Sequence, residues 1–265
     1  MTPQRGSWRR WPPTSTDAVA GGGGSDSAAG FGEQIRHHLA RIERENADVL
    51  EAVTGTILEV VRADGLVYAA GTGHSMALVL ETFYRAGGLA CVYPLYHAGL
   101  LPLEGGSAST LVERQPGIAA TLLGRISPGA GDVAFVFTNS GVNPVPVELA
   151  MGFRDAGTPV VGVVSVPHMS ATPPRADAKL GDVATYVIDT LVTPGDATFH
   201  AADVTIAALS SLASVFVWDL LLARVAEAAA GEGIDLPVWT SANVPGGDER
   251  NATLMERYRS RVPLL

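Results

Sequence analysis

Cysteine and lysine are nearly absent from this chain. Among its 265 residues, Cys91 is the only cysteine and Lys179 is the only lysine. A single cysteine excludes disulfide bonds within the chain and fits a reducing cytoplasm. A single lysine means that any Schiff-base mechanism would have to use Lys179. No apolar run reaches the roughly 20 residues that a membrane-spanning helix requires, so we expect no membrane contact.

Positive charge is scarce as well. The formal net charge is −9 at pH 7, and no stripe of basic residues is present that would neutralise a nucleic-acid backbone. We therefore expect no nucleic-acid partner, whereas a phosphorylated small molecule needs only a few local donors. The 6 histidines are dispersed along the chain, so we expect no metal site and no cofactor.

The first thirty residues differ in composition from the rest. Proline, glycine, serine and threonine dominate there, and Gly21 to Gly24 are consecutive. Such a segment cannot bury enough apolar surface to become ordered. We expect a disordered tail over residues 1–30 and one α/β domain over residues 31–265, because 47% hydrophobic residues suffice for a single large core.

Hydrophobic periodicity alternates between strand and helix after this tail. Short apolar runs predict strands at residues 66–70, 89–93, 132–138, 159–164 and 182–189. Helical spacing predicts helices at residues 34–61, 77–86, 118–123, 145–157 and 205–230. The segment 96–110 is rich in glycine and proline and should form a loop or broken helix. Continuous apolar strands separated by helices predict a parallel sheet covered on both faces.

Two turns rich in glycine and hydroxyl groups follow predicted strands. The first is Gly71-Thr72-Gly73-His74-Ser75, and the second is Thr138-Asn139-Ser140-Gly141, with Asn143 shortly after it. Glycine lets the backbone approach a ligand, and a following helix offers free N–H groups to an anion. Ligands of such sheets bind at the carboxyl ends of the strands. Two such turns indicate one phosphate held between them; the alternative is that their serines are ordinary helix caps.

These turns carry a resemblance to a known family. The segments GTGHS, TNSGVNPVP and SVPHMS resemble the sugar isomerase (SIS) domain family, whose phosphosugar-binding fold is a three-layer αβα sandwich with a five-stranded parallel sheet. Further segments resemble a bacterial subfamily of single-domain SIS proteins related to N-acetylmuramic acid 6-phosphate etherases, among them Phe83 to Gly88, Leu103-Glu104-Gly105, Pro194 to Ala197 and Ser241 to Asp248. The resemblance covers residues 34–258.

The resemblance implies a set of phosphate-binding residues. It consists of Ser75, Asn139 and Ser140, with His74 and Thr138 beside them. From the turns themselves we add Gly73 and Asn143, and we expect Ser165, which follows another predicted strand, to close the site. One departure from the subfamily follows His168, where a serine-rich run with two lysines is replaced by a segment containing Arg175 and Lys179. We expect Arg175 or Lys179 to supply the positive charge there.

Sugar-phosphate isomerisation and elimination both begin with removal of a proton next to a carbonyl, so each needs a base. Glu104 is our first candidate, since its irregular apolar loop should bury it partly. His97 shares that loop, and Glu81 lies on the helix after Ser75. Glu45 matches an acidic position in the subfamily's first helix, and SIS domains lend such helices across dimer interfaces. The alternative for Glu45 is a solvated helix face.

Three functions remain open at this point. The preferred one is a lyase or dehydratase that acts on a 2-acetamido sugar 6-phosphate of the N-acetylglucosamine 6-phosphate type, removing the C2 proton and eliminating the C3 substituent. The others are an aldose-ketose sugar-phosphate isomerase and a non-catalytic phosphosugar sensor. A DNA-binding domain is not expected, because residues 1–30 are too short and unpatterned for one. We expect a homodimer.

Overall fold

The computed structural model describes residues 28–265 of the chain. The disordered tail expected at residues 1–30 lies outside this part, apart from residues 28–30, which begin the first helix. Within residues 28–265, no helix combines the length and the apolar character that are needed to span a bilayer.

A parallel sheet of five strands forms the centre of the molecule, in the order β2-β1-β3-β4-β5. Its strands are β1 (Val67–Gly71), β2 (Val92–Pro94), β3 (Val133–Phe137), β4 (Val160–Val164) and β5 (Tyr186–Asp189). Every residue of β1, β3 and β4 is buried, because helices cover both faces of the sheet. The predicted parallel sheet and its five strands are confirmed.

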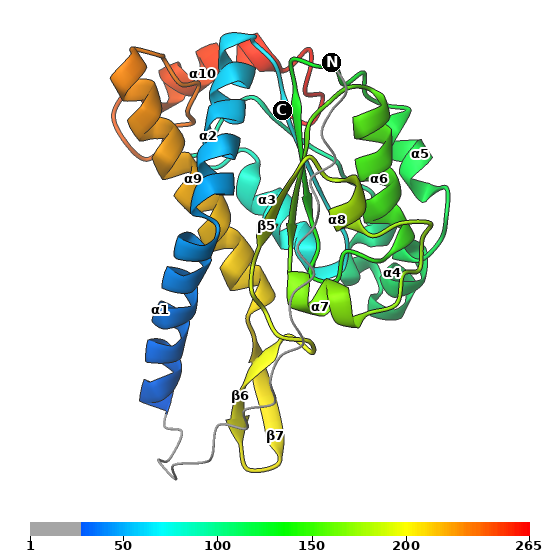
Figure 1. The fold of residues 1–265 in the computed structure, drawn as a ribbon. Coiled ribbons are helices and arrows are strands. Elements are labelled where there is room, and N and C mark those ends of the chain that lie inside the picture. The colour runs from blue at the N-terminus through cyan, green and yellow to red at the C-terminus, as the bar shows by residue number, and fades with distance from the viewer. Residues whose placement is uncertain (1–27) are drawn as a thin grey trace.

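Helices form the two outer layers (Figure 1). One face is covered by α2 (Ala47–Arg62), α3 (Met76–Thr82) and α9 (Ser210–Glu232), and the other by α5 (Ile118–Leu123), α6 (Pro144–Asp155) and α8 (Leu180–Val183). The core continues through both layers: Phe135 packs edge-on against Trp218 at 5.3 Å between ring centroids, and Tyr68 packs against Phe153 at 5.2 Å. This arrangement is the three-layer sandwich that the sequence predicts.

The remaining helices lie at the two ends of the strands. The helices α4 (Gly106–Glu113) and α7 (Val166–Ala171) lie at the carboxyl end, and α10 (Gly247–Tyr258) lies at the opposite end (Figure 1). The segment expected as loop or broken helix contains two 3-10 helices before α4, η2 (Ala98–Leu100) and η3 (Pro102–Glu104). A third, η1 (Gly73–Ser75), precedes α3.

The long helix predicted at residues 34–61 is two helices, α1 (Ala28–Glu45) and α2, separated at Asn46. The side-chain amide of Asn46 donates to the Ile42 carbonyl oxygen at 2.7 Å and also bonds to the backbone of Asp189 in β5. A local side-chain bond of this kind competes with regular helix geometry. The chain therefore bends at Asn46, and α1 extends beyond the carboxyl end of the sheet (Figure 1).

The predicted start of the helix at residues 205–230 is wrong. Residues 204–208 form β7 (Val204–Ala208), which pairs antiparallel with β6 (Ala197–Ala201), and α9 begins only at Ser210. The carboxylate of Asp196 accepts hydrogen bonds from the backbone N–H groups of Leu209 and Ser210, and these bonds fix the helix start. This hairpin lies beside α1, where Phe31 and Phe199 pack edge-on at 5.7 Å between centroids. We call α1 and the β6–β7 hairpin together the arm.

Other boundaries differ from the expectation as well; the strand predicted at residues 89–93, for example, begins only at Val92. The helix predicted at residues 77–86 ends at Thr82, because Tyr84 and Gly87 adopt positive φ angles of 46° and 88° that cannot continue a helix. The strand predicted at residues 182–189 begins at Tyr186, and its first residues belong to α8.

Candidate functional site

A cavity of about 400 Å³ lies at the carboxyl end of the sheet. The turns that follow β1 and β3 form two of its walls, and α4 and α7 contribute the others. Parallel strands of such sheets place their connecting turns at this end, which is where ligands bind.

The turn after β1 brings Thr72, Gly73, His74 and Ser75 to the cavity. Gly71 has to be glycine, because a Cβ atom there would lie 2.5 Å from the Ser75 carbonyl oxygen. Gly73 has a φ angle of 58°, which favours glycine. The sequence thus forms a tight turn that exposes the Ser75 side chain to the cavity.

The turn after β3 brings Thr138, Asn139, Ser140 and Asn143 to the same cavity. Thr138 Oγ1 accepts a hydrogen bond from the backbone N–H of Gly141 at 3.2 Å, which closes the turn. Asn143 is the residue before the first turn of α6. Seven of the eight residues expected to bind phosphate therefore line one cavity.

The eighth, Ser165, lies behind the cavity wall rather than in it. Its side chain is fully buried, its hydroxyl donates to the Val192 carbonyl oxygen, and it accepts from the backbone N–H of His168 at 3.1 Å. Ser165 is thus the N-cap of α7. Its neighbour His168 does line the cavity, and His168 Nδ1 lies 3.1 Å from Nδ2 of Asn139.

Glu113, at the end of α4, is a cavity residue that the sequence analysis missed. Its Oε2 accepts from the Thr72 hydroxyl at 2.9 Å, and its Oε1 accepts from the Asn143 amide at 2.9 Å. The Asn143 carbonyl oxygen in turn accepts from the Arg175 guanidinium at 2.8 Å. Glu113 therefore links both turns. The contacts join residues far apart in sequence, and no local pattern indicates them.

None of the four residues proposed as a base from the sequence lines the cavity. Glu104 ends η3 and is exposed, next to Leu103 at 90% exposure, so the expected partial burial is wrong: the loop runs over the surface. Glu81 forms an ion pair with Arg85 at 2.8 Å. The remaining two also have local partners.

His97 accepts a hydrogen bond from the backbone N–H of Gly99 at 3.1 Å and thereby caps η2. Glu45 lies at the end of α1 and pairs with Arg41 at 3.4 Å and with Arg44 at 3.2 Å. Neither side chain lines the cavity.

The charges around the cavity are mixed. His74, Arg114 and Arg175 line it together with two carboxylates, those of Glu113 and Asp196. Asp196 is already engaged by the start of α9, where the Ser210 hydroxyl donates to it at 2.7 Å. No group of three or more histidine, cysteine or acidic side chains that could hold a metal ion occurs in the part of the chain that the structure describes.

Comparison with known proteins gives a consistent picture. Residues 30–165 match the SIS domain family. A UPF0309 protein from Listeria innocua is 33% identical over 231 residues, which is 86% of this chain and 94% of that protein. A UPF0309 protein from Brucella canis is 37% identical over 233 residues, which is 87% of this chain and 93% of that protein. Among solved structures, phosphoheptose isomerase from Neisseria gonorrhoeae aligns with a TM-score of 0.45 at 16% identity, over 77% of this chain and 96% of that one.

Proposed function

The chain belongs to the SIS domain family, a family with a phosphosugar-binding fold, and we propose that its cavity holds the phosphate of a sugar phosphate between the turns after β1 and β3. The observation that carries this proposal is that Ser75 and Ser140, from two separate turns, line one cavity. The first turn offers backbone N–H groups at glycine, and the second leads into the N-terminal end of α6, which favours an anion.

Positive charge near these turns supports an anionic ligand. Arg114 and Arg175 line the cavity, and hydrogen bonds from charged donors to phosphate are among the stronger ones in proteins. Arg175 is held by Asn143 and thus points its guanidinium toward the second turn.

Beside the phosphate, we infer a role for Glu113 in proton transfer. A carboxylate can take up a proton at neutral pH, and Glu113 lines the same cavity as the proposed phosphate-binding residues. Glu113 is fixed by Thr72 and Asn143, so its carboxylate is held next to both phosphate turns. This placement supports an enzyme rather than a sensor, and it favours Glu113 over the exposed Glu104 as the base.

The proposed reaction is an elimination on the open-chain form of a 2-acetamido sugar 6-phosphate. The base takes the C2 proton, and the C–H electron pair forms the C1–C2 double bond of an enolate. The aldehyde then re-forms, a C2–C3 double bond is made, and the C3 oxygen leaves and takes up a proton. Because aldose-ketose isomerisation needs a hydroxyl at C2, the isomerase alternative would use a sugar without the acetamido group.

Incubation of the purified protein with a panel of hexose and hexosamine 6-phosphates, followed by mass spectrometry, tests this proposal. Loss of water from N-acetylglucosamine 6-phosphate is the expected result. A product of unchanged mass with altered retention, formed only from 2-hydroxy sugars, would establish an isomerase. Binding without any product would leave a sensor, and the absence of binding to the whole panel would refute the phosphosugar site.

A further inference from the structure

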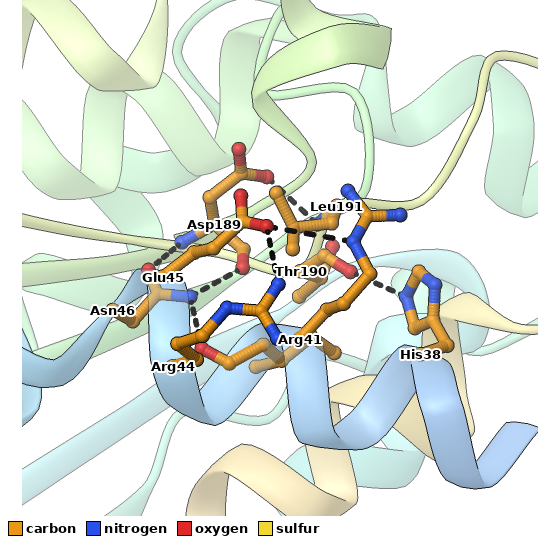
Figure 2. Close-up of polar contacts among 9 residues, drawn as sticks. His38, Arg41, Arg44, Glu45, Asn46, Asp189, Thr190 and Leu191 are labelled. Atoms are coloured by element: carbon orange, nitrogen blue, oxygen red, sulfur yellow. Dashed lines mark hydrogen bonds and ion pairs between the residues drawn. The ribbon is translucent and has the colours of Figure 1, made fainter.

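A group of charged and polar side chains lies outside the cavity, where the bend between α1 and α2 meets the end of β5 (Figure 2). Its centre is Asp189, the last residue of β5. Oδ1 of Asp189 accepts from the backbone N–H of Val166 at 2.9 Å and from that of Leu191 at 2.8 Å. Val166 is the first residue of α7, so this carboxylate fastens the start of α7 to the edge of the sheet.

The backbone of Asp189 is held from the other side by Asn46. Its N–H donates to Asn46 Oδ1 at 2.8 Å, and its carbonyl oxygen accepts from Asn46 Nδ2 at 2.9 Å. The amide of Asn46 thereby makes the two backbone hydrogen bonds that a neighbouring strand would make at the free edge of β5, and Asn46 is buried there. Asp189 is thus fixed at both its backbone and its side chain.

From α7 the contacts continue to the cavity. His168 lies two residues after Val166, and its ring contacts the Asn139 side-chain amide at 3.1 Å. The side-chain amide oxygen of Asn139, Oδ1, is buried and has no hydrogen-bond partner within residues 28–265. The His168 contact is therefore what orients this amide in the second phosphate turn.

We propose that Asp189 is a positioning residue for the site: its carboxylate holds α7 so that His168 keeps Asn139, and with it the turn after β3, in the anion-binding arrangement. The proposal rests on the proposed phosphate site. The proposal also implies that the site loses anion affinity when the pH falls far enough to protonate Asp189, because a protonated Asp189 accepts the two N–H groups less strongly.

The surroundings of Asp189 raise the pH at which its carboxylate takes up a proton above that of an ordinary aspartate. Burial raises the pKa of Asp189, the two backbone N–H bonds oppose that effect, and the Glu45 charge raises the pKa further, while His38 lowers it. Figure 2 shows the Glu45 carboxylate beside Asp189, turned toward Arg41 and Arg44. His38 itself is placed by a 2.8 Å contact to the Thr190 carbonyl oxygen.

Sulfate is a suitable probe, because it keeps its charge between about pH 4 and pH 8, the range in which carboxylates and histidines titrate. Relative to Asp189→Asn, which has the same cavity histidines, we expect the parent protein to lose sulfate affinity toward the acid end, by up to about tenfold per pH unit, the limit for one proton. Asp189→Asn keeps an acceptor oxygen but cannot titrate. With its neutral acceptor it resembles protonated Asp189, so it should bind sulfate at neutral pH about as weakly as the parent does at the acid end, and it should lack the acid-side decrease.

Glu45→Gln is the matched control. Removing the negative charge beside Asp189 should shift the midpoint of the decrease to lower pH and leave neutral affinity unchanged. An Asp189→Asn variant whose affinity falls as the parent's does would overturn the proposal. If that variant does not fold, an unshifted midpoint in Glu45→Gln would overturn it instead.

A second readout separates this proposal from the phosphate site. The side-chain amide signal of Asn139, followed by NMR over the same pH range without ligand, should show a step at the Asp189 midpoint in the parent that is missing in Asp189→Asn, whereas any effect of the neighbouring His168 is common to both proteins. If the parent binds no sulfate at any pH, the sugar-phosphate panel decides on the phosphate site, and the Asn139 signal alone decides the role of Asp189. A signal that is independent of pH in the parent would show that Asp189 does not reach the turn.

Discussion

The carboxylate of Glu113 and the amide of Asn143 are joined by a 2.9 Å hydrogen bond that connects α4 to the start of α6. The other oxygen of Glu113 accepts from Thr72 in the turn after β1. One side chain thus joins the two turns that form the proposed phosphate site. We propose this carboxylate as the base that acts on the bound sugar phosphate.

Replacing Glu113 by glutamine should therefore separate binding from turnover. Glutamine has nearly the same shape but cannot take a proton at neutral pH, so we expect turnover to fall by about 10²–10⁴-fold with sugar-phosphate binding retained. The control is Glu104→Gln, which changes an exposed carboxylate two residues from the cavity-lining Pro102 and should stay within a few-fold of the parent. Loss of turnover in Glu104→Gln alone would return the role of base to Glu104.

The two cavity serines should contribute separately to phosphate affinity. Ser75→Ala and Ser140→Ala are each expected to weaken binding by about 1–3 kcal/mol, since each removes a hydrogen bond to a charged group. Calorimetric titration with a hexosamine 6-phosphate measures the loss, and thermal unfolding should be unchanged.

Ser165→Ala is the control for these serines. Its hydroxyl caps α7 and lies outside the cavity, so its removal should lower the stability of the protein by about 0.5–2 kcal/mol. A double Ser75 and Ser140 variant that binds like the parent would refute the shared phosphate site.

Much of the sheet could be predicted because its strands are buried on both faces and therefore read as continuous apolar runs. The strand expected at residues 132–138 contains β3 with one extra residue at each end, and α5 matches its predicted bounds. The hairpin of the arm could not be found in this way. Its turn places Ala202 at a φ angle of 50° without the glycine or asparagine that usually marks such a turn, and β7 runs directly into an apolar helix.

The residues of the candidate site likewise fall into those that the local sequence indicates and those whose role depends on tertiary contacts. The turns containing Ser75 and Ser140 were found because small polar residues follow apolar strands. Glu113 was missed because its role depends on contacts with Thr72 and Asn143, which belong to other elements. Burial also depends on tertiary structure: a loop of leucines and glycines suggested a sheltered Glu104, yet the side chain is exposed.

The arm should form part of a two-fold homodimer interface. A two-stranded hairpin is marginal in water by itself, and this one exposes Val204 and Ile206, which stand on the same face of β7 at 54% and 51% exposure. We expect light scattering to give a dimer mass for the parent and a monomer mass for the double Val204→Asp and Ile206→Asp variant. Leu103→Asp, which alters an exposed leucine far from the arm in sequence, should remain dimeric. A monomeric parent with full activity would refute the interface.

Cys91 should be inert toward thiol reagents in the folded protein. Burial raises the pKa of its thiol to about 12, so almost no thiolate is present at neutral pH, and the side chain is 1% exposed. Alkylation should therefore proceed only as fast as the protein unfolds, and complete modification in denaturant is the control. Rapid stoichiometric labelling of the native protein would show that the region around β2 opens locally.

Asp189 gives the sharpest prediction about stability, because its effects on folding and on binding should have opposite signs. The pKa of Asp189 is raised in the folded protein by burial first and by Glu45 in addition. The folded state therefore favours the protonated form. The corresponding stability is present below the unfolded pKa of about 3.9 and is lost as the pH rises through the folded pKa. Each unit between the two values costs about 1.4 kcal/mol at neutral pH.

Chemical denaturation of the parent and of Asp189→Asn across this pH range measures that cost. The asparagine retains the acceptor for Val166 and Leu191 but carries no charge. We therefore expect the variant to gain stability relative to the parent as the pH rises from acid to neutral, while anion binding in the parent improves over the same interval.

A parent that loses both stability and binding toward acid, with the variant following it in both, would indicate general acid unfolding. A difference between variant and parent that does not change with pH would mean that the Asp189 pKa is not raised. Opposite trends in stability and binding would show that the charged carboxylate of Asp189 lowers the stability of the fold and favours anion binding. This is the result expected if its charge holds α7 in place.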